Sequence, residues 1–195
     1  MKIKHYQLFQ VKPRFLLLRI ETDTGLHGWG EPTLEGHTTT VAAAVEAMMR
    51  MIVGEDPRRI EHLWQKMYRA GFYRGGPVLC SAISGIEQCL WDILGKSLNA
   101  PVWQLLGGKV RDKIRMYAQL PGSRAEVVRE RMRRARAQGF TAFKCGPWRA
   151  VNIVDAPAKI ERAVSVMKAL REEAGDKVEI GMDAHGRLSP AMAIQ

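Results

Sequence analysis

Residues 114–120 (IRMYAQL), 141–145 (TAFKC) and 178–183 (VEIGMD) are three short segments in which apolar side chains are frequent. Between them lie residues 123–138 and 156–173, where apolar positions recur every three or four residues, the spacing of a helix with one buried face. The order strand, helix, strand, helix, strand predicts parallel strands joined by right-handed crossovers. In such a unit, active-site groups lie at the carboxyl ends of the strands.

The ends of the helices in this half are marked by capping residues. Ser123 is expected to be the N-cap of the first helix and Gly139 its stop. Ser189-Pro190 predicts the N-cap and the first position of a third helix.

The first half of the chain has a different pattern. Residues 2–9, 15–20 and 26–31 alternate apolar and polar side chains, and Gly25 provides a hairpin turn between the last two. Helical spacing follows, and a glycine-rich loop at 71–77 precedes the clearest amphipathic segment. The apolar stripe of that segment is Ile83, Ile86, Leu90, Ile93 and Leu94. An antiparallel meander followed by helices is therefore predicted.

Composition and charge restrict the class of protein. The chain has 195 residues, 46% of them hydrophobic, and a net charge of +10, values of a soluble globular protein rather than a disordered one. No apolar run reaches the roughly 20 residues of a membrane span, and the N-terminus has no signal-peptide core. We expect a cytoplasmic protein with no membrane partner. The basic residues accompany no nucleic-acid motif, so nucleic acid is not an expected partner either.

Three cysteines are present, and none of their spacings is the C-x-x-C of a zinc or redox site. Cys80 and Cys89 lie in apolar segments. Because free cysteine is among the most frequently buried residue types, both are predicted to be buried.

Three residues that could carry chemistry lie at predicted strand ends: Lys144, Asp183 and His185. Residues two apart on a strand point to the same face, so Asp183 and His185 are expected side by side at the mouth of the sheet. A carboxylate is a ligand suited to Mg²⁺, and an imidazole can move protons near neutral pH. Spacing alone leaves structural roles open: a helix cap for Asp183, a backbone hydrogen bond for His185 and an ion pair for Lys144.

Two longer motifs resemble those of a known family. Residues 28–31 (GWGE) lie in the predicted meander, and residues 82–96 (AISGIEQCLWDILGK) are continued by PVWQLLGG at 101–108. These stretches resemble the enolase superfamily, in its mandelate racemase and muconate-lactonizing branch. One departure is Cys89, where the branch usually has Ala.

The resemblance implies a fold class: an α+β capping domain followed by an incomplete α/β barrel of the TIM type, a modified (β/α)₇β barrel of which the first three strands are present. The capping domain would cover residues 1–117 and the barrel part 118–195. Residues 69–77 (RAGFYRGGP) and 183–187 (DAHGR) are most similar to galactonate dehydratase-like sugar-acid dehydratases. Such enzymes abstract the proton α to a carboxylate and eliminate water, leaving a 2-keto-3-deoxy acid.

The resemblance also implies site roles and a cofactor. Mg²⁺ would stabilise the enediolate, with Asp183 as the first of three acidic ligands. His185 would be the general acid that protonates the departing hydroxyl. The implied substrate-binding residues are Lys144, Tyr73, Arg74 and His37. A packed turn between two helices is the structural alternative for the loop that carries Tyr73 and Arg74.

The triplet Lys144-Cys145-Gly146 differs from both patterns that the branch has at its second strand. Racemases and epimerases tend to have Lys-x-Lys there, and the galactonate dehydratases have a triplet similar to Lys-x-Asn. A racemase or epimerase of the same superfamily is the alternative activity. A non-catalytic basic binding protein is the alternative from another class. The expected partner is a small sugar acid, and the complete enzyme is expected to be a homo-oligomer.

The length bears on activity. After residue 117, 195 − 117 = 78 residues remain, whereas a complete barrel takes roughly 250. We therefore expect a fragment of a dehydratase that is inactive alone, with the other acidic ligands and the base beyond Gln195. Its partial sheet is expected to have an open edge and an apolar inner face.

Overall fold

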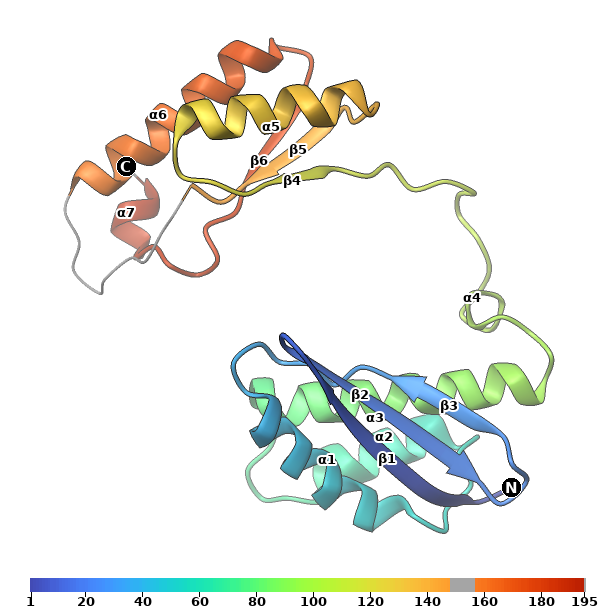
Figure 1. Cartoon of the computed structure of the whole chain (residues 1–195). Helices are drawn as coiled ribbons and strands as arrows, with labels where there is room; N and C mark the ends of the chain where they lie inside the picture. Colours follow the sequence, from blue (N-terminus) through green and yellow to red (C-terminus); the bar gives the residue numbers. More distant parts are fainter. Residues whose placement is uncertain (148–156, 195) are drawn as a thin grey trace. The chain divides into compact units, whose positions relative to one another are not determined.

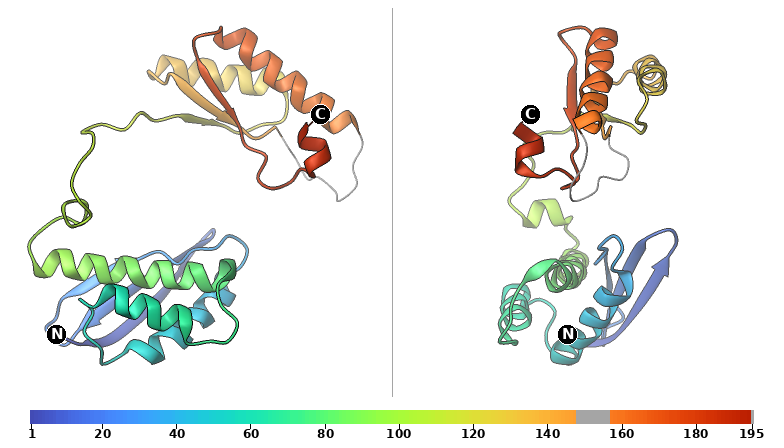
Figure 2. Two further views of the ribbon diagram at one scale, coloured as in Figure 1. Left: turned by 180° about the vertical axis from the view of Figure 1, so that it is seen from behind. Right: turned by 90° about the vertical axis from the view of Figure 1, so that its left-hand side faces the viewer.

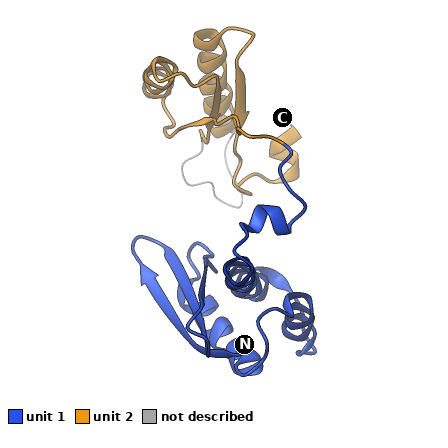
Figure 3. Ribbon diagram, turned by 90° about the vertical axis from the view of Figure 1, so that its right-hand side faces the viewer, with its two compact units in different colours: residues 1–110 blue, residues 111–195 orange. Residues whose placement is uncertain are grey.

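The computed structural model describes residues 1–147 and 157–194. The chain divides into two compact units, unit 1 (residues 1–110) and unit 2 (residues 111–195), each described by itself below (Figure 1, Figure 3). The assignment of a capping domain to residues 1–117 and of a barrel part to residues 118–195 stays a prediction.

Unit 1 is a three-stranded antiparallel sheet with helices on one face. Its elements are β1 (Ile3–Val11), β2 (Phe15–Thr22), β3 (His27–Gly30), α1 (Thr38–Ile52), α2 (Ile60–Arg69), α3 (Gly76–Ser97) and α4 (Val102–Leu105). The strands pair in the order β1-β2-β3, as the predicted meander requires. Helices α1, α2 and α3 lie on the same side of the sheet (Figure 2).

The core of unit 1 forms between β2 and the helices. Alternate residues of β2, Leu16, Leu18 and Ile20, are fully buried against α1 and α3. The predicted stripe of α3 is confirmed, since Ile83, Ile86, Leu90 and Ile93 are buried and Leu94 is partly buried. Within the described residues, α3 is also the one helix whose length and composition would suffice for a membrane span. Its buried face is explained by the core of unit 1.

Strand β3 and helix α3 approach each other backbone to backbone. A methyl group at Gly30 would lie 2.0 Å from the carbonyl oxygen of Gly85, and one at Gly28 would lie 2.1 Å from that of Cys89. Real Cβ atoms essentially never come within 3.0 Å of such an atom. These two positions of the GWGE motif are therefore restricted to glycine by the helix packed above them.

Polar side chains of α3 also hold the backbone of β3. Asp92 accepts a hydrogen bond from the Trp29 backbone N–H at 2.9 Å. Lys96 Nζ donates to Asp92 at 2.7 Å and to the His27 carbonyl at 2.8 Å. Asp92 and Lys96 are four residues apart on α3 and form an ion pair. The motifs at residues 28–31 and 82–96 thus form one structural contact between β3 and α3.

Unit 2 is a three-stranded parallel sheet with helices α5 and α6 on one face (Figure 1). Its elements are β4 (Ala118–Leu120), α5 (Ala125–Ala137), β5 (Ala142–Cys145), α6 (Pro157–Ala174), β6 (Glu179–Met182) and α7 (Pro190–Ile194). The strand order is β4-β5-β6, so the predicted series of parallel strands and crossover helices is confirmed. Strand β4 is shorter than predicted, and the predicted helix start at residue 156 lies outside the described residues.

Two of the predicted helix starts can be compared with the structure. Helix α5 begins at Ala125 with Arg124 at its N-cap position, so the prediction of Ser123 as the N-cap is wrong. The backbone at Arg124 is extended, which delays the first helical residue. For α7 the prediction is confirmed, because Ser189 Oγ accepts a hydrogen bond from the Met192 N–H at 3.2 Å.

Three arginines of α5 bind the C-terminal end of α6. Arg129 pairs with Glu172, and Arg133 forms two hydrogen bonds to Glu173, of 2.8 and 2.7 Å. Arg136 donates to the Glu173 carbonyl at 3.1 Å. Carbonyl groups at a helix C-terminus carry partial negative charge, which favours this arrangement. These arginines of α5 therefore form a contact between two helices.

The sheet face opposite α5 and α6 is polar, so the prediction of an apolar inner face is wrong. Phe143 and Cys145 of β5 pack with the helices, which directs Lys144 to the other face. Glu179 and Arg115 form an ion pair of 2.8 Å on this face. The strands are short, and their apolar residues are used on the helix side.

The cysteines divide into two groups. Cys89 and Cys145 are buried, whereas Cys80 is exposed. The prediction of a buried Cys80 is wrong because Cys80 lies one helical turn before the exposed Ser84, away from the apolar stripe of α3.

Candidate functional site

Lys144, Asp183 and His185 lie together at the carboxyl ends of β5 and β6. Lys144 Nζ is 2.8 Å from Asp183 Oδ2, and His185 Nδ1 is 2.9 Å from Asp183 Oδ1. The two strands are parallel, with Lys144 opposite Gly181, so the carboxyl ends of β5 and β6 lie at the same edge of the sheet. One carboxylate is thus held between an ammonium and an imidazole.

The turn after β6 creates this arrangement. Strand β6 ends at Met182, and the Asp183 N–H then donates to the Cys145 carbonyl at 2.9 Å. His185 has a left-handed backbone with φ of 49°, and its N–H donates to Asp183 Oδ1 at 2.9 Å. The expected proximity of Asp183 and His185 is present. It results from this turn and not from the alternation of side chains along a strand.

The charges of the pair stabilise each other. The pKa of Asp183 is lowered, mainly by the hydrogen bond from Lys144 and then by the one from the His185 backbone. The pKa of Lys144 is raised, mainly by its hydrogen bond to Asp183. When Nδ1 of His185 donates to Asp183, Nε2 is the ring nitrogen left to exchange a proton. The His185 side chain is 60% exposed, so such a proton can reach a ligand in solvent.

Tyr117 is a neighbour of this cluster that the sequence analysis did not identify. Lys144 Nζ lies 5.5 Å from the centroid of the Tyr117 ring. Gln119 pairs opposite Lys144, and Tyr117 precedes it by two residues, so both positions face the polar side of the sheet. Only the strand register reveals this relation, because Tyr117 and Lys144 are far apart in the sequence.

A cavity of about 650 Å³ lies beside Lys144, with Tyr117, Phe143, Glu179 and Ile180 also among its lining residues. Neither Asp183 nor His185 is among them. Gly146 follows β5 next to the Asp183 carbonyl oxygen, which a methyl group at Gly146 would meet at 3.6 Å. That is an ordinary van der Waals distance, so the position has room for a side chain. The cavity therefore leaves open space for a small ligand beside Lys144.

The remaining predicted site residues belong to unit 1. Tyr73 is 87% exposed and contacts Phe72 edge to face, with the ring centroids 5.3 Å apart. Arg74 Nε donates to the Gly71 carbonyl within the same loop at 3.4 Å. His37 is exposed and occupies the N-cap position of α1. The structure does not bring His37 together with Tyr73 and Arg74 through any contact among the described residues.

The donor atoms of the described side chains decide whether a metal ion fits this site. Among residues 1–147 and 157–194, no three His, Cys, Asp or Glu side chains form a group that could hold a metal. Both oxygens of Asp183 accept hydrogen bonds, Oδ2 from Lys144 and Oδ1 from His185. Mg²⁺ prefers six oxygen ligands in octahedral geometry. Asp183 is therefore suitable as one ligand, but the described residues do not fit Mg²⁺ as a complete site.

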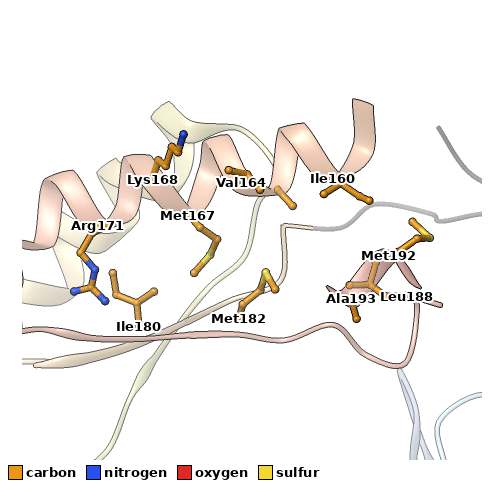
Figure 4. A pocket seen from close by; sticks show the side chains of 11 residues that line it. Ile160, Val164, Met167, Lys168, Arg171, Ile180, Met182, Leu188, Met192 and Ala193 are labelled. Atoms are coloured by element: carbon orange, nitrogen blue, oxygen red, sulfur yellow. The ribbon is translucent and has the colours of Figure 1, made fainter. Parts of the chain in front are cut away.

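An apolar groove of about 480 Å³ lies elsewhere in unit 2, between α6, β6 and α7 (Figure 4). Ile180 and Met182 line it from β6, and Met167 lines it from α6. Because Gly181 is opposite Lys144, the alternating Ile180 and Met182 point away from the polar face. The groove is thus separate from the candidate site and has none of its polar groups.

The chain matches two family descriptions. Residues 9–107 match "Mandelate racemase / muconate lactonizing enzyme, N-terminal domain", and residues 127–195 match "Enolase C-terminal domain-like". A curated relative, the D-galactonate dehydratase of Cronobacter sakazakii (strain ATCC BAA-894), is 50% identical over 193 residues. That alignment covers 99% of this chain and 50% of the relative. The chain spans about half the length of the curated relatives it matches.

Solved structures agree with this assignment. A mandelate racemase/muconate lactonizing enzyme from Jannaschia sp. CCS1 superposes with a TM-score of 0.90 at 31% identity, covering 100% of this chain and 57% of that chain. An enolase from Pantoea ananatis with bound D-gluconate and Mg has a TM-score of 0.85 at 28% identity, covering 99% of this chain and 55% of that one. The predicted fold class, an α+β part followed by an incomplete barrel, is confirmed. The chain belongs to the mandelate racemase/muconate lactonizing enzyme family of the enolase superfamily.

Proposed function

We propose that the protein is a Mg²⁺-dependent sugar-acid dehydratase that acts on a galactonate-like aldonate. The observation that carries the proposal is the cluster of Lys144, Asp183 and His185 at the carboxyl ends of two parallel strands. It places a cation and a proton donor each within hydrogen-bond distance of one carboxylate. The 50% identity to a D-galactonate dehydratase supports the choice of reaction and substrate class.

The cluster suits the elimination of water from an aldonate. A base outside the described residues would take the proton α to the carboxylate. The electron pair of that C–H bond forms the new carbon–carbon double bond, and the bond from the next carbon to its hydroxyl oxygen breaks. His185, protonated at Nε2, would donate the proton that converts this hydroxyl to water, while Asp183 holds the ring through Nδ1. The Lys144 ammonium would bind the substrate carboxylate, an anion of the same kind as its present partner. The product enol then becomes a 2-keto-3-deoxy acid.

Mg²⁺ is part of the proposal, with Asp183 as one of its ligands. When bound, the ion supplies positive charge next to the substrate carboxylate during proton removal. The described residues provide a single carboxylate at this place. We therefore expect the 195-residue chain to bind Mg²⁺ weakly and to show no dehydratase activity alone.

The loop of unit 1 supplies the proposed contacts to the polyol. Tyr73 and Arg74 are exposed on it, and a phenol and a guanidinium can hydrogen-bond hydroxyl groups and pair with a carboxylate. His37 is proposed as a third contact. A cytoplasmic location and a homo-oligomeric enzyme belong to the same proposal.

The test uses a hybrid polypeptide. This chain is joined to the half of the Cronobacter sakazakii relative that it does not match, and the hybrid is incubated with Mg²⁺ and a panel of hexonates and pentonates. The 2-keto acid product is measured as its semicarbazone. We expect product from a galactonate-like aldonate with the hybrid and none with the 195-residue chain.

Variants of the hybrid assign the activity to this chain's residues. Asp183→Asn and His185→Asn should each lower kcat by about 10²-fold or more, the usual size of a general acid contribution. Arg187→Gln, in the same loop, is the matched control. A folded hybrid that converts no aldonate, or an Asp183→Asn variant as active as the parent hybrid, would refute the proposal. Product formed by the 195-residue chain would refute the expectation that it is inactive alone.

A further inference from the structure

We propose that Tyr117 is a positioning residue of the candidate site, whose ring face holds the Lys144 ammonium beside Asp183. The purpose that we give this placement, receiving an anionic group of the substrate, rests on the proposed function. Its geometry rests on the 5.5 Å between Lys144 Nζ and the Tyr117 ring centroid, together with the 2.8 Å to Asp183 Oδ2. An ammonium within about 6 Å of a ring face is attracted by the negative potential of that face.

The path of the lysine side chain across the sheet supports this role. A methyl group at Gly181 would lie 3.9 Å from Cγ of Lys144, so the aliphatic stem passes beside Gly181. Asp183 follows β6 and Tyr117 precedes β4, so the tip of Lys144 meets groups from the two strands on either side of β5. Three contacts, from the two segments on either side of β5, thus define one position for a flexible side chain.

Each contact contributes something that the others do not. The ion pair with Asp183 fixes the distance of the ammonium from one carboxylate, but a lysine has a long stem and can keep that distance in several rotamers. The ring face of Tyr117 restricts the direction from which the ammonium approaches. Lys144 and Asp183 have side-chain exposures of 29% and 25%, so water competes for both and a second contact matters. We infer that Tyr117 keeps Lys144 ready to receive an anionic substrate group.

The experiment measures the reactivity of Lys144 toward reductive methylation with formaldehyde and borohydride, by peptide mass spectrometry of the 195-residue chain. Lys168 and Lys177, both in unit 2, are the internal references. Tyr117→Leu should speed Lys144 methylation about two- to fivefold, the population change for loss of an exposed cation–π contact. Tyr117→Phe keeps the ring but removes the hydroxyl, which also hydrogen-bonds Lys144, so its acceleration should be smaller than that of Tyr117→Leu.

Two further variants check the assay. Asp183→Asn removes the ion pair and should speed methylation of Lys144. Trp103→Leu removes an exposed aromatic ring in unit 1 and should leave the Lys144 rate unchanged. Neither measurement depends on turnover, so failure here is distinguishable from failure of the hybrid in the dehydratase assay.

The outcomes separate clearly. Faster methylation of Lys144 in Tyr117→Leu than in Tyr117→Phe, with wild-type rates at both reference lysines, supports the proposal. An unchanged Lys144 rate in Tyr117→Leu overturns it. Equal acceleration in the leucine and phenylalanine variants overturns the role of the ring face, and equal acceleration of Lys168 and Lys177 shows a general loss of structure and also counts against it.

Discussion

The close approach of β3 and α3 gives a sharp prediction for Gly30→Ala. The added methyl group would lie 2.0 Å from the Gly85 carbonyl oxygen, about 1.4 Å short of an ordinary 3.4 Å contact. The methyl carbon is fixed directly to the backbone of β3, and the oxygen belongs to the backbone of α3, so no side chain can rotate to make room. The helix and strand must separate, and the buried residues between them must lose contacts.

The size of the effect follows from this geometry. Overpacked substitutions cost about 1–3 kcal/mol and sometimes more, and a clash of backbone with backbone belongs at the upper end. We expect the free energy of unfolding to fall by about 3 kcal/mol. For a unit of this size, about 4–8 °C is lost per kcal/mol, so the melting temperature should fall by roughly 12–24 °C.

The assay is thermal unfolding followed by tryptophan fluorescence, since four of the five tryptophans lie in unit 1. Gly71→Ala, in the same unit, is the control, because its methyl group would come no closer than 3.3 Å to another atom. The double variant Gly28→Ala/Gly30→Ala should cost less than the sum of the single variants, since one separation of strand from helix relieves both clashes. A fall of less than about 4 °C for Gly30→Ala, a cost below about 1 kcal/mol, would refute the reasoning.

Two further predictions concern titrating groups. Burial raises the pKa of Cys89 to about 12 and that of Cys145 to about 11. Only Cys80 should therefore react rapidly with a thiol reagent at pH 8, whereas all three thiols should react in denaturant. Rapid labelling of the Cys80→Ser variant at pH 8 would contradict this. The pKa of Asp56 is lowered to about 2 from 3.8, mainly by its hydrogen bond to Arg58, so the stability that this carboxylate contributes is present above about pH 4 and lost as the pH falls toward 2. Asp56→Asn should flatten that part of the pH dependence of the melting temperature, and an unchanged slope would count against it.

Local patterns were sufficient for the secondary structure and its order. The apolar stripe of α3 and the alternation in β2 each describe a single element, and burial follows directly from them. Ser189 as a cap also depends on residues within one turn. Features of this kind require no knowledge of which segments are neighbours in space.

The missed features depend on packing between elements. The role of Tyr117 requires the register of β4 against β5, and the polar inner face requires knowing which side the helices cover. Cys80 was misplaced because it shares an apolar segment but not the buried side of its helix. Asp183 and His185 were predicted to be neighbours for the wrong reason, because strand geometry was extended past Met182 into a turn.

The arginines that join α5 to α6 have a consequence for how unit 2 responds to its medium. Arg129, Arg133 and Arg136 connect the two crossover helices through charged groups at the surface, beside a buried apolar contact that includes Met132 and Leu170. Dissolved ions at 1 M reduce the range of such attractions to about 3 Å. Added sodium chloride should thus weaken the packing of α5 against α6. It should leave the stability of unit 1 almost unchanged, because that unit is stabilised mainly by buried aliphatic groups.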